Sequence, residues 1–310
     1  MIACSSIQAL AEHGISRVAL ACGNFDGVHR GHRKILSKAV AEAKQNGSTP
    51  TVLTFSPHPR EFFTGEVLPT LSSQAYRFRC FKEIGIEAVV TLPFTSELAN
   101  TPAEDFIKQH FLCESIKLTD LCVGRKWSFG AQRQGCIESL QSYSKHFTTH
   151  AIDEVLLNEY PVSSSRIRQA LSQGDFPAAE DLMGHPWKIS GNVIHGKKIA
   201  STQLNFPTAN LDIDIKLLPI SGVFAVRANL AGRQLEGLLN IGAAPTFAEK
   251  ASLLQHVELH LFNFDQDIYD QHISVSFIKF LRPEQKFASI QELKDQITRD
   301  AAQARQIFHA

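Results

Sequence analysis

Two histidines, His29 and His32, lie one helical turn apart directly after a glycine-rich turn, Gly23-Asn-Phe-Asp-Gly27. Side chains at this spacing project from one face of a helix, so both imidazoles can donate to the same phosphate oxygens. A helix N-terminus adds unpaired N–H groups and a positive dipole end. The alternative, a plain turn with two solvated histidines, does not account for the whole string. The stretch therefore predicts a phosphate site, with catalytic histidines and a turn formed by Gly23, Phe25, Asp26 and Gly27.

Three further stretches in the first part of the chain combine rigid or small residues with basic and aromatic ones. They are TFSPHPREFF (54–63), VGRKWSFGAQRQG (123–135) and VSSSRIR (162–168). In the first, two prolines predict a rigid loop that presents His58. In the third, one serine is expected to cap a helix, which leaves Arg166 and Arg168 without a structural explanation.

The last third of the chain contains four more stretches with polar residues in apolar surroundings. They are NFPTANL (205–211), NIGAAPTF (240–247), VELHLFNFDQDIY (257–269) and LRPEQKF (281–287). Taken alone, a glutamate in a predicted strand, such as Glu258, is most often a solvated side chain. The chemistry of these stretches therefore depends on what they resemble together.

Taken together, these stretches resemble the bifunctional riboflavin kinase/FAD synthetases over essentially the whole chain. The GxFDGxH and HxGH strings are similar to the nucleotidylyltransferase superfamily, and NFPTANL is similar to the GFPTANL motif of the kinase half. The resemblance implies phosphorylation of riboflavin by ATP to give FMN. It also implies transfer of AMP from ATP to FMN, giving FAD and pyrophosphate. Mg²⁺ is the implied cofactor, ATP the co-substrate, and FMN and FAD are substrate and product.

The same resemblance implies roles for individual residues. Glu258 is the implied base on the ribityl 5′-hydroxyl, which attacks the γ-phosphate of ATP. Thr208 and Asn210 are implied to bind Mg²⁺–ATP through a hydroxyl and an amide oxygen. Further phosphate contacts are expected from His58, Ser164, Ser165, Arg166, Arg168, Lys197 and Lys198. A flavin-side loop is expected to include Lys126, Trp127, Phe129 and Arg133.

Two stretches depart from the family's pattern. Lys126, preceded by Arg125, stands where the family commonly has an acidic or amide residue, which either removes a metal or ligand contact or adds a cation for phosphate. The kinase phosphate loop reads HGKKIASTQLNFPTAN where the family has HGxxxGRxxGFPTAN. Ala200-Ser201 thus replaces Gly-Arg and Asn205 replaces a glycine, which restricts close approach of the backbone to phosphate.

These departures leave alternatives to a fully bifunctional enzyme. One is an FAD synthetase whose C-terminal domain is a weakened kinase that binds flavin or aids assembly. Another is a non-catalytic regulator that binds flavin or nucleotide. A nucleotidylyltransferase for another phosphorylated acceptor, such as a pantetheine or choline phosphate, would have no use for the kinase motifs.

The elements that position these residues fall into two styles. Strands at 17–22, 51–56, 88–93 and 118–123 alternate with helices at 33–45, 75–84 and 136–145. Another helix start, with a capping-box pair and a proline, is expected at Thr101-Pro-Ala-Glu104. This pattern predicts a Rossmann-like α/β domain with a parallel sheet and helices on both faces, over residues 1–183.

From residue 184 onward the pattern changes to hairpin-like strands at 188–194, 222–230, 235–241, 256–262 and 273–280. A turn is expected at 231–233 and a long helix at 289–308. We therefore expect an antiparallel β-barrel domain with a C-terminal helix over residues 184–310.

Composition sets the wider limits. The 310 residues carry 31 basic and 31 acidic side chains, so neither nucleic acid nor a membrane surface is an expected partner. No apolar run is long enough for a membrane helix, and the six scattered cysteines are typical of reduced thiols in a cytoplasmic protein. Small-molecule substrates are the expected partners, and the sequence leaves a homo-oligomer open.

Overall fold

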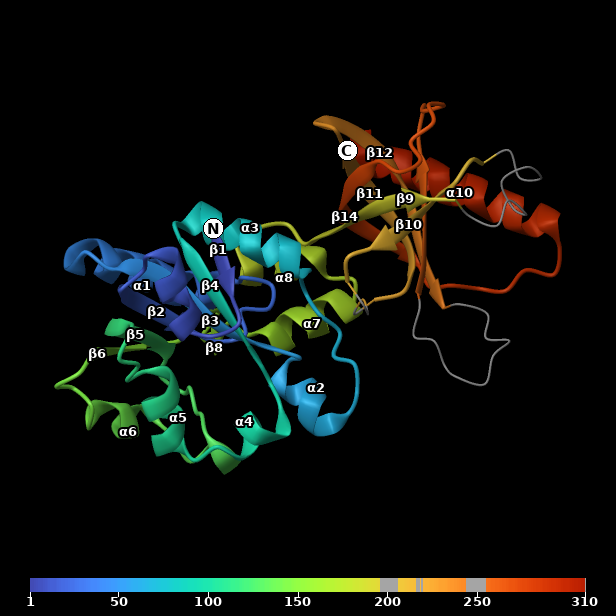
Figure 1. The fold of residues 1–310 in the computed structure, drawn as a ribbon. Coiled ribbons are helices and arrows are strands. Elements are labelled where there is room, and N and C mark those ends of the chain that lie inside the picture. Colours follow the sequence, from blue (N-terminus) through green and yellow to red (C-terminus); the bar gives the residue numbers. More distant parts are fainter. Residues whose placement is uncertain (196–205, 216–217, 219, 244–254, 310) are drawn as a thin grey trace. The chain divides into compact units, whose positions relative to one another are not determined.

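The computed structural model describes residues 1–195, 206–215, 218, 220–243 and 255–309 (Figure 1). Contacts divide the chain into two compact units. The first is Met1–Leu68 with Ala75–Ser163, and the second is Pro69–Gln74 with Ser164–Ala310. The change in sequence pattern predicts a domain boundary between residues 183 and 184. The contact-based division falls earlier because α7 (Ser164–Ser172) and α8 (Phe176–Met183) are counted with the second unit.

The first unit is built on a six-stranded parallel sheet (Figure 1). Its spatial order is β1 (Ile2–Cys4), β4 (Ala88–Pro93), β3 (Thr49–Ser56), β2 (Arg17–Cys22), β5 (Lys117–Gly124) and β6 (Thr148–Ile152). From β2 the chain moves outward through β3 and β4, then returns to the other side of β2 to form β5. Open α/β sheets bind ligands at such a switch point, outside the carboxyl ends of the strands.

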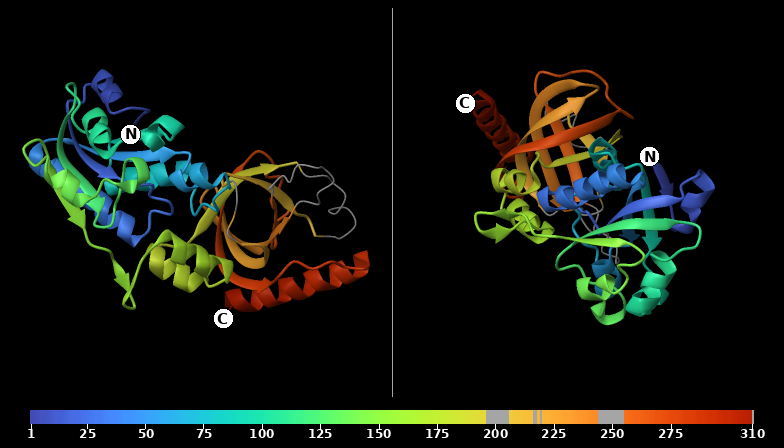
Figure 2. Two further views of the ribbon diagram at one scale, coloured as in Figure 1. Left: turned by 90° about the horizontal axis from the view of Figure 1, so that it is seen from below. Right: turned by 90° about the vertical axis from the view of Figure 1, so that its left-hand side faces the viewer.

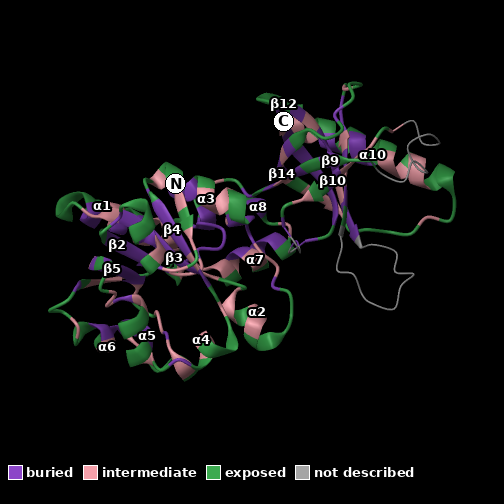
Figure 3. Cartoon of the chain, in the orientation of Figure 1, coloured by how far each residue is buried: buried purple, intermediate pink, exposed green. Residues whose placement is uncertain are grey.

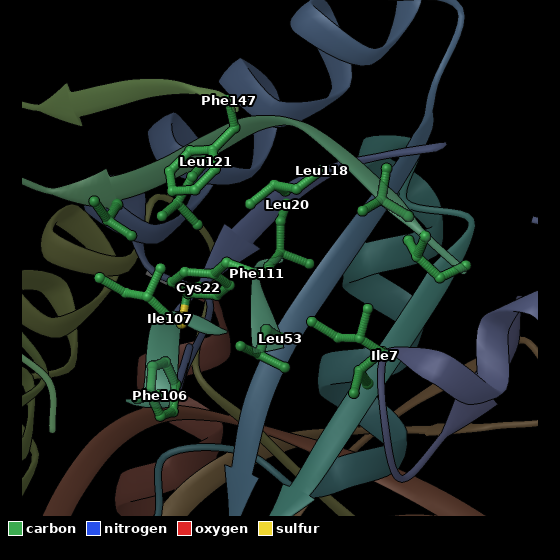
Figure 4. Close-up of a cluster of buried hydrophobic side chains, with 14 of the residues drawn as sticks. Ile7, Leu20, Cys22, Leu53, Phe106, Ile107, Phe111, Leu118, Leu121 and Phe147 are labelled. Atoms are coloured by element: carbon green, nitrogen blue, oxygen red, sulfur yellow. The ribbon is translucent and has the colours of Figure 1, made fainter. Parts of the chain in front are cut away.

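Both faces of this sheet are covered. On one face α1 (Arg30–Asn46) and α3 (Gln74–Ile84) pack against β2 and its neighbours through residues such as Leu36, Phe81 and Val52. On the other face lie η1 (Gln8–His13), α5 (Ala103–His110) and α6 (Ile137–Gln141), which pack in a second apolar cluster. Figure 4 shows part of this cluster, including Phe106 and Ile107 of α5. The four inner strands β4, β3, β2 and β5 are therefore buried from both sides (purple in Figure 3), as their apolar runs predicted.

Short elements complete this unit at the loops. They are α2 (Pro59–Thr64), α4 (Ser96–Asn100), the 3-10 turn η2 (Ala131–Arg133) and the two-stranded pair β7 (Leu156–Leu157) and β8 (Tyr160–Pro161).

The described strands of the second unit form a closed antiparallel barrel, seen end-on in the left view of Figure 2. Its order is β10 (Ala209–Ile213), β13 (Gln255–Leu261), β12 (Arg233–Ala243), β11 (Gly222–Leu230), β14 (His272–Arg282) and β9 (Lys188–Ile194). The β11–β12 hairpin turns through Ala231 and Gly232, which have φ of 49° and 87°. Positive φ at both positions is what a two-residue type I′ turn requires.

Helices cover the outside of this barrel. The long α10 (Ile290–His309) packs Ala301 and Ala304 against an apolar patch of β11 and β12. On α8, the ring of Phe176 stacks on Phe277 of β14, with centroids 5.2 Å apart. The predicted fold classes are confirmed: a Rossmann-like parallel sheet, then an antiparallel barrel with a C-terminal helix. Within the described residues, no helix combines the length and the apolar character needed to cross a membrane.

Two local predictions are wrong in part. A helix does start within residues 101–104, since α5 begins at Ala103, but the predicted capping box is not formed. Thr101 does not cap a following helix; it ends α4, where its hydroxyl donates to the carbonyl oxygen of Glu97 at 2.8 Å. Helix α5 begins at Ala103 with Pro102 as its N-cap residue, and no side chain caps it. The helix expected over 136–145 is also shorter and ends at Gln141.

Candidate active sites

The glycine-rich turn after β2 has an unusual and well-supported backbone. Phe25, Gly27 and Val28 have φ of 53°, 80° and 42°. Positive φ is uncommon for a residue with a side chain and is a real outlier for a β-branched one. Both Phe25 and Val28 are buried, and the N–H of Gly23 donates to the carbonyl oxygen of Leu53 at 3.0 Å. A backbone that stays in a costly conformation needs surrounding structure to hold it, and such turns gather at functional sites.

The two histidines lie against each other at the start of α1. His29 is the N-cap residue, and its Nδ1 accepts the backbone N–H of His32 at 3.3 Å. The two imidazole rings stack with centroids 3.5 Å apart. Since Nδ1 of His29 acts as an acceptor, the neutral ring carries its proton on Nε2. The pair therefore offers an N–H donor at the N-terminus of a helix.

Burial sets the charge state of His32. Its pKa lies well below the ordinary value for histidine, first because the ring is buried and then because of the charges of His29 and Arg77. The ring is therefore neutral at physiological pH, with one donor and one acceptor nitrogen. Phe25 supplies part of the burial, in an edge-to-face contact whose ring centroids lie 5.3 Å apart.

Polar atoms without hydrogen-bond partners lie at the carboxyl ends of β2 and β3, within the described residues. Asn24 Oδ1, His32 Nδ1 and Thr54 Oγ1 are buried and have no hydrogen-bond partner in the part of the chain that the structure describes. Asn24 directly follows β2, and Thr54 lies near the end of β3. Buried polar groups are almost always hydrogen-bonded, so three open ones at one strand edge are expected where a polar ligand binds.

His58 lies in the loop that follows β3. It is the N-cap of α2, and its Nδ1 accepts the N–H of Arg60 at 3.0 Å. Beside it the rings of Phe62 and Phe63 both meet Phe94, which follows β4, at 5.3 and 5.8 Å. Phe63 is 68% exposed, which leaves an aromatic surface open to solvent. The sequence analysis did not single out these phenylalanines, although the adjacent pair at 62–63 was a usable signal.

The predicted flavin-side loop follows β5. Trp127 and Phe129 stack with centroids 4.7 Å apart, and Phe129 is buried in the apolar cluster of this face. The Nε of Arg133 donates to Ser128 Oγ at 2.8 Å. Phe129 therefore supports the loop from within, while the indole of Trp127 is its partly exposed face.

Lys126, which departs from the family pattern, and the preceding Arg125 both have acidic partners. Lys126 Nζ lies 2.7 Å from a carboxylate oxygen of Glu154, and Arg125 pairs with Asp153. Asp153 and Glu154 directly follow β6, so the pairs join the ends of two neighbouring strands. The positive charges of Lys126 and Arg125 are therefore neutralised locally by Glu154 and Asp153.

The serine–arginine stretch belongs to the second unit from Ser164 onward. Helix α7 begins at Ser164, which places Ser165 and Arg166 in its first turn. Arg168 Nε donates to the carbonyl oxygen of Pro69 at 2.5 Å. This arginine thus ties α7 to the segment Pro69–Gln74.

The predicted kinase residues meet in a cavity between the outside of the barrel and α10. The cavity holds about 270 Å³ and is lined by Thr208, Asn240, Glu258, Asp300 and their apolar neighbours. Asn210 on β10 and Asn240 on β12 stand directly opposite Glu258 on β13, one on each side. Residues opposite each other in an antiparallel pair share a face of the sheet. Asn240 therefore flanks the predicted base, although the sequence analysis did not assign it a role.

A second cavity adjoins Thr208 on its other side. It holds about 430 Å³ and is lined by β9, β10, β13 and the loop 264–269. Tyr269 of that loop stacks on His195 with centroids 3.8 Å apart. Thr208 is thus shared by two cavities, and its segment is held where His260 Nδ1 meets the carbonyl oxygen of Pro207 at 2.8 Å. Lys197, Lys198, Ala200, Ser201 and Asn205 lie outside the described residues.

The donor set around Thr208 suits magnesium. A threonine hydroxyl, an asparagine amide and the carboxylate of Glu258 are all hard oxygen donors, which Mg²⁺ prefers. By contrast, the cluster of Glu42, Asp120 and His150 in the first unit is already satisfied. Glu42 pairs with Lys38, and Asp120 accepts from Asn46 at 2.6 Å and contacts His150 at 2.9 Å. That cluster is explained as a buried hydrogen-bond network.

Comparisons with known proteins divide the chain in the same way as its motifs. Residues 12–166 match the FAD synthetase family model, and residues 183–308 match the riboflavin kinase model. The chain is 39% identical over 285 residues to the bifunctional riboflavin kinase/FMN adenylyltransferase of Pseudomonas fluorescens, which covers 91% of this chain and 90% of the relative. The chain belongs to the bifunctional riboflavin kinase/FMN adenylyltransferase family.

Other relatives of the riboflavin kinase/FMN adenylyltransferase family extend this match. The protein of Escherichia coli K12 is 36% identical over 293 residues, covering 93% of this chain and 92% of the relative. That of Bacillus subtilis is 31% identical over 297 residues, covering 94% and 93%. Among solved structures, one titled macrolide-efflux protein, from Streptococcus pneumoniae, superimposes with a TM-score of 0.80 at 26% identity and covers 98% of both chains.

The family assignment confirms the resemblance found in the sequence. The turn and histidines lie within the FAD synthetase match, and Thr208, Asn210 and Glu258 lie within the riboflavin kinase match. Arg168 lies beyond the end of the first match, in keeping with its place in the second unit. A match to both halves does not favour a non-catalytic regulator or an FAD synthetase whose C-terminal domain is a weakened kinase.

Proposed function

We propose that this chain converts riboflavin to FAD in two ATP-dependent steps, with the kinase in the barrel unit and adenylyl transfer in the α/β unit. The family assignment supports both activities, while the residues that carry them are our proposal. The main structural support is the stacked histidine pair at the start of α1, at the switch point of the parallel sheet, in which His29 is the buried N-cap and His32 is half-buried.

In adenylyl transfer, a phosphate oxygen of FMN attacks the α-phosphorus of ATP. A new P–O bond forms, the bond between the α-phosphorus and the bridging oxygen breaks, and pyrophosphate leaves. His29 and His32 donate hydrogen bonds to the phosphate oxygens as charge moves onto the leaving group. The N–H groups at the start of α1 and the Gly23–Gly27 turn bind the same phosphates.

Other residues of the adenylylation site hold the two substrates. His58, Ser164, Ser165, Arg166 and Arg168 are proposed to bind nucleotide phosphates. The partly exposed rings of Phe62, Phe63, Phe94 and Trp127 offer flat apolar surfaces for the isoalloxazine ring of FMN. Lys126 and Arg133 border this flavin side, and Phe129 supports the loop from its buried position.

In the kinase step, Glu258 accepts the proton of the ribityl 5′-hydroxyl. The alcohol oxygen attacks the γ-phosphorus of ATP, the bond to the β-phosphate oxygen breaks, and ADP leaves. Asn210 and Asn240 flank the carboxylate, and Thr208 stands between a cavity for the flavin and one for the nucleotide. Mg²⁺, held by Thr208 and Asn210, would neutralise charge on the transferred phosphate. Lys197 and Lys198 are proposed as further phosphate contacts.

The remaining proposals concern the setting of the enzyme. We propose that the boundary between the two functional domains lies between residues 183 and 184. We also propose that the protein is cytoplasmic and that its small-molecule partners are riboflavin, FMN and ATP. Neither nucleic acid nor a membrane is part of this proposal, and a homo-oligomer stays open.

The decisive experiment follows the products over time. Purified protein receives riboflavin, ATP and Mg²⁺, and chromatography separates riboflavin, FMN and FAD. FMN should accumulate first and then decline as FAD forms. A parallel reaction starts from FMN. Production of FAD from FMN, with no product from riboflavin, would contradict the proposed kinase.

A further inference from the structure

Arg77 of α3 stands behind the histidine turn and contacts its backbone. The Nη1 of Arg77 donates to the carbonyl oxygen of Asn24 at 3.3 Å. The carboxylate of Asp26, which is buried in the same turn, lies close enough to stabilise the charged guanidinium. From the same helix, the ring of Phe81 meets the ring of Phe25 edge-on at 5.9 Å. Helix α3 thus supports the strained turn at two of its side chains and one carbonyl.

The same guanidinium acts on His32. Its positive charge is one of three causes that keep the pKa of His32 low, after burial of the ring and the charge of His29. Other charged groups nearby act elsewhere: Asp26 acts on Arg77 itself, and Arg33 of α1 acts on Tyr76 and Cys80 of α3. Arg77 is therefore the residue through which α3 places charge beside the histidine pair.

We propose that Arg77 is a positioning residue for adenylyl transfer, which fixes the Gly23–Gly27 turn and holds a positive charge beside His32. The inference rests on the proposed role of the histidines. Arg77 contacts the turn and acts through it, so that the phosphate-binding backbone keeps its shape and His32 meets ATP as a neutral donor. A neutral imidazole at this position already carries an N–H group. It can therefore donate a hydrogen bond to phosphate as negative charge develops, without first being protonated.

The sign of the expected pH effect follows from the charge. Removal of a nearby positive charge makes protonation of His32 easier, so its pKa rises. If the neutral ring is the active form, the acidic limb of kcat/KM for ATP moves to higher pH. The loss of activity should therefore be larger at pH 6 than at pH 8.

Three variants test the proposal in the full-length chain. Arg77→Met removes the charge and the donor, while Arg77→Lys keeps the charge but not the forked geometry. Arg79→Met is the matched control, because Arg79 lies on the same helix, is exposed and stacks over Tyr76 at 5.0 Å. The readouts are kcat/KM for FAD formation from FMN between pH 5.5 and 9, riboflavin phosphorylation by the same preparations, and the pKa of His32 by NMR, assigned with His32→Gln.

Arg77→Met should lower kcat/KM for adenylyl transfer by about tenfold to hundredfold, as displacement of a positioning element does. Its acidic limb and the pKa of His32 should both move upward, while the kinase activity is unchanged. Arg77→Lys should recover the wild-type limb and part of the rate, and Arg79→Met should match the wild type.

Either of two results would overturn the proposal. One is an Arg77→Met enzyme that behaves like Arg79→Met. The other is a lower rate with an unmoved acidic limb, since general loosening of the fold would give that pattern. If wild-type protein forms no FAD from FMN, the proposed function has failed, which is a separate outcome seen before any variant is made.

Discussion

The two candidate sites of this chain are built in different ways. In the α/β unit, the backbone groups and the two helix-start histidines that we propose as the centre of the site lie within one short stretch, residues 23–32. In the barrel, the cavity residues Thr208, Asn240 and Glu258 come from segments distant in sequence and meet only through strand register. A site made by one turn is visible in a linear motif. No single motif contains a site made by register: Thr208 and Glu258 were found through separate motifs, and Asn240 only once the strands were paired.

The difference also sets what each site tolerates. The turn depends on backbone conformation, with positive φ at Phe25 and Val28. The barrel cavity depends on side chains that stand on a regular sheet, where one can be replaced with little change in its neighbours. Variants of the two sites should therefore fail in separate activities and to different degrees.

The largest effect is expected from His29→Ala combined with His32→Ala. Loss of two preorganised donors should lower kcat/KM for adenylyl transfer by about 10⁴, since each such donor contributes roughly 10² to 10³. Riboflavin phosphorylation should be unchanged. The assay is FAD formation from FMN, with His146→Ala, an exposed histidine of the same unit, as control. A parallel fall in kinase activity would contradict two independent sites.

Glu258→Gln should lower riboflavin phosphorylation by about 10³, because a general base contributes roughly 10² to 10⁴. FAD formation from added FMN should stay at the wild-type rate. The matched control is Glu236→Gln on β12, a partly exposed barrel glutamate that faces Arg227. Equal loss in the two variants would show that Glu258 has no special role.

Asn240→Ala tests whether register alone identifies a functional neighbour. Because Asn240 lies directly opposite Glu258, loss of its amide from beside the carboxylate should lower the kinase kcat by about tenfold. Asn192→Ala on β9 is the control, since Asn192 is exposed and its amide oxygen meets His272 instead. An unchanged kcat in Asn240→Ala would show that Asn240 is not part of the site, which would leave the residues identified by motif resemblance.

The smallest effect is expected from Lys126→Asn, which restores an amide at the position where the family commonly has one. Lys126 is already paired with Glu154 in an exposed ion pair, and such pairs contribute little. FAD formation should change by less than about threefold. A large gain would indicate that this lysine weakens metal or flavin binding, and a large loss would indicate a phosphate contact.

Much of the fold was predictable because its strands are apolar on both faces or alternate strictly. The bounds of β2, β4, β9 and β11 agree with the predicted ranges. Elements fixed by local competition were not: Thr101 looked like a cap, but its hydroxyl bonds to the previous turn. The short β1 and β6 at the sheet edges carry too little periodicity to be recognised.

The candidate sites show the same contrast. The histidine turn was predictable because its chemistry and its geometry lie in one string. The contribution of Arg77 could not be predicted, since only the packing of α3 behind the turn brings its guanidinium to Asn24. Asn240 was within a recognised stretch, yet its place beside Glu258 needed the β12–β13 pairing.

The segment Pro69–Gln74 has a practical consequence for anyone who would study the two activities apart. It lies within the first half of the sequence but is counted with the barrel unit, where Arg168 bonds to Pro69 and the indole of Trp187 donates to Leu71 at 2.8 Å. A protein fragment that starts at residue 184 would lack the carbonyl oxygen of Leu71, which accepts from Trp187, and also Phe176, which stacks on Phe277 of the barrel. Because the barrel unit also includes Pro69–Gln74, dividing the chain at one position cannot give two fragments that each contain a complete unit.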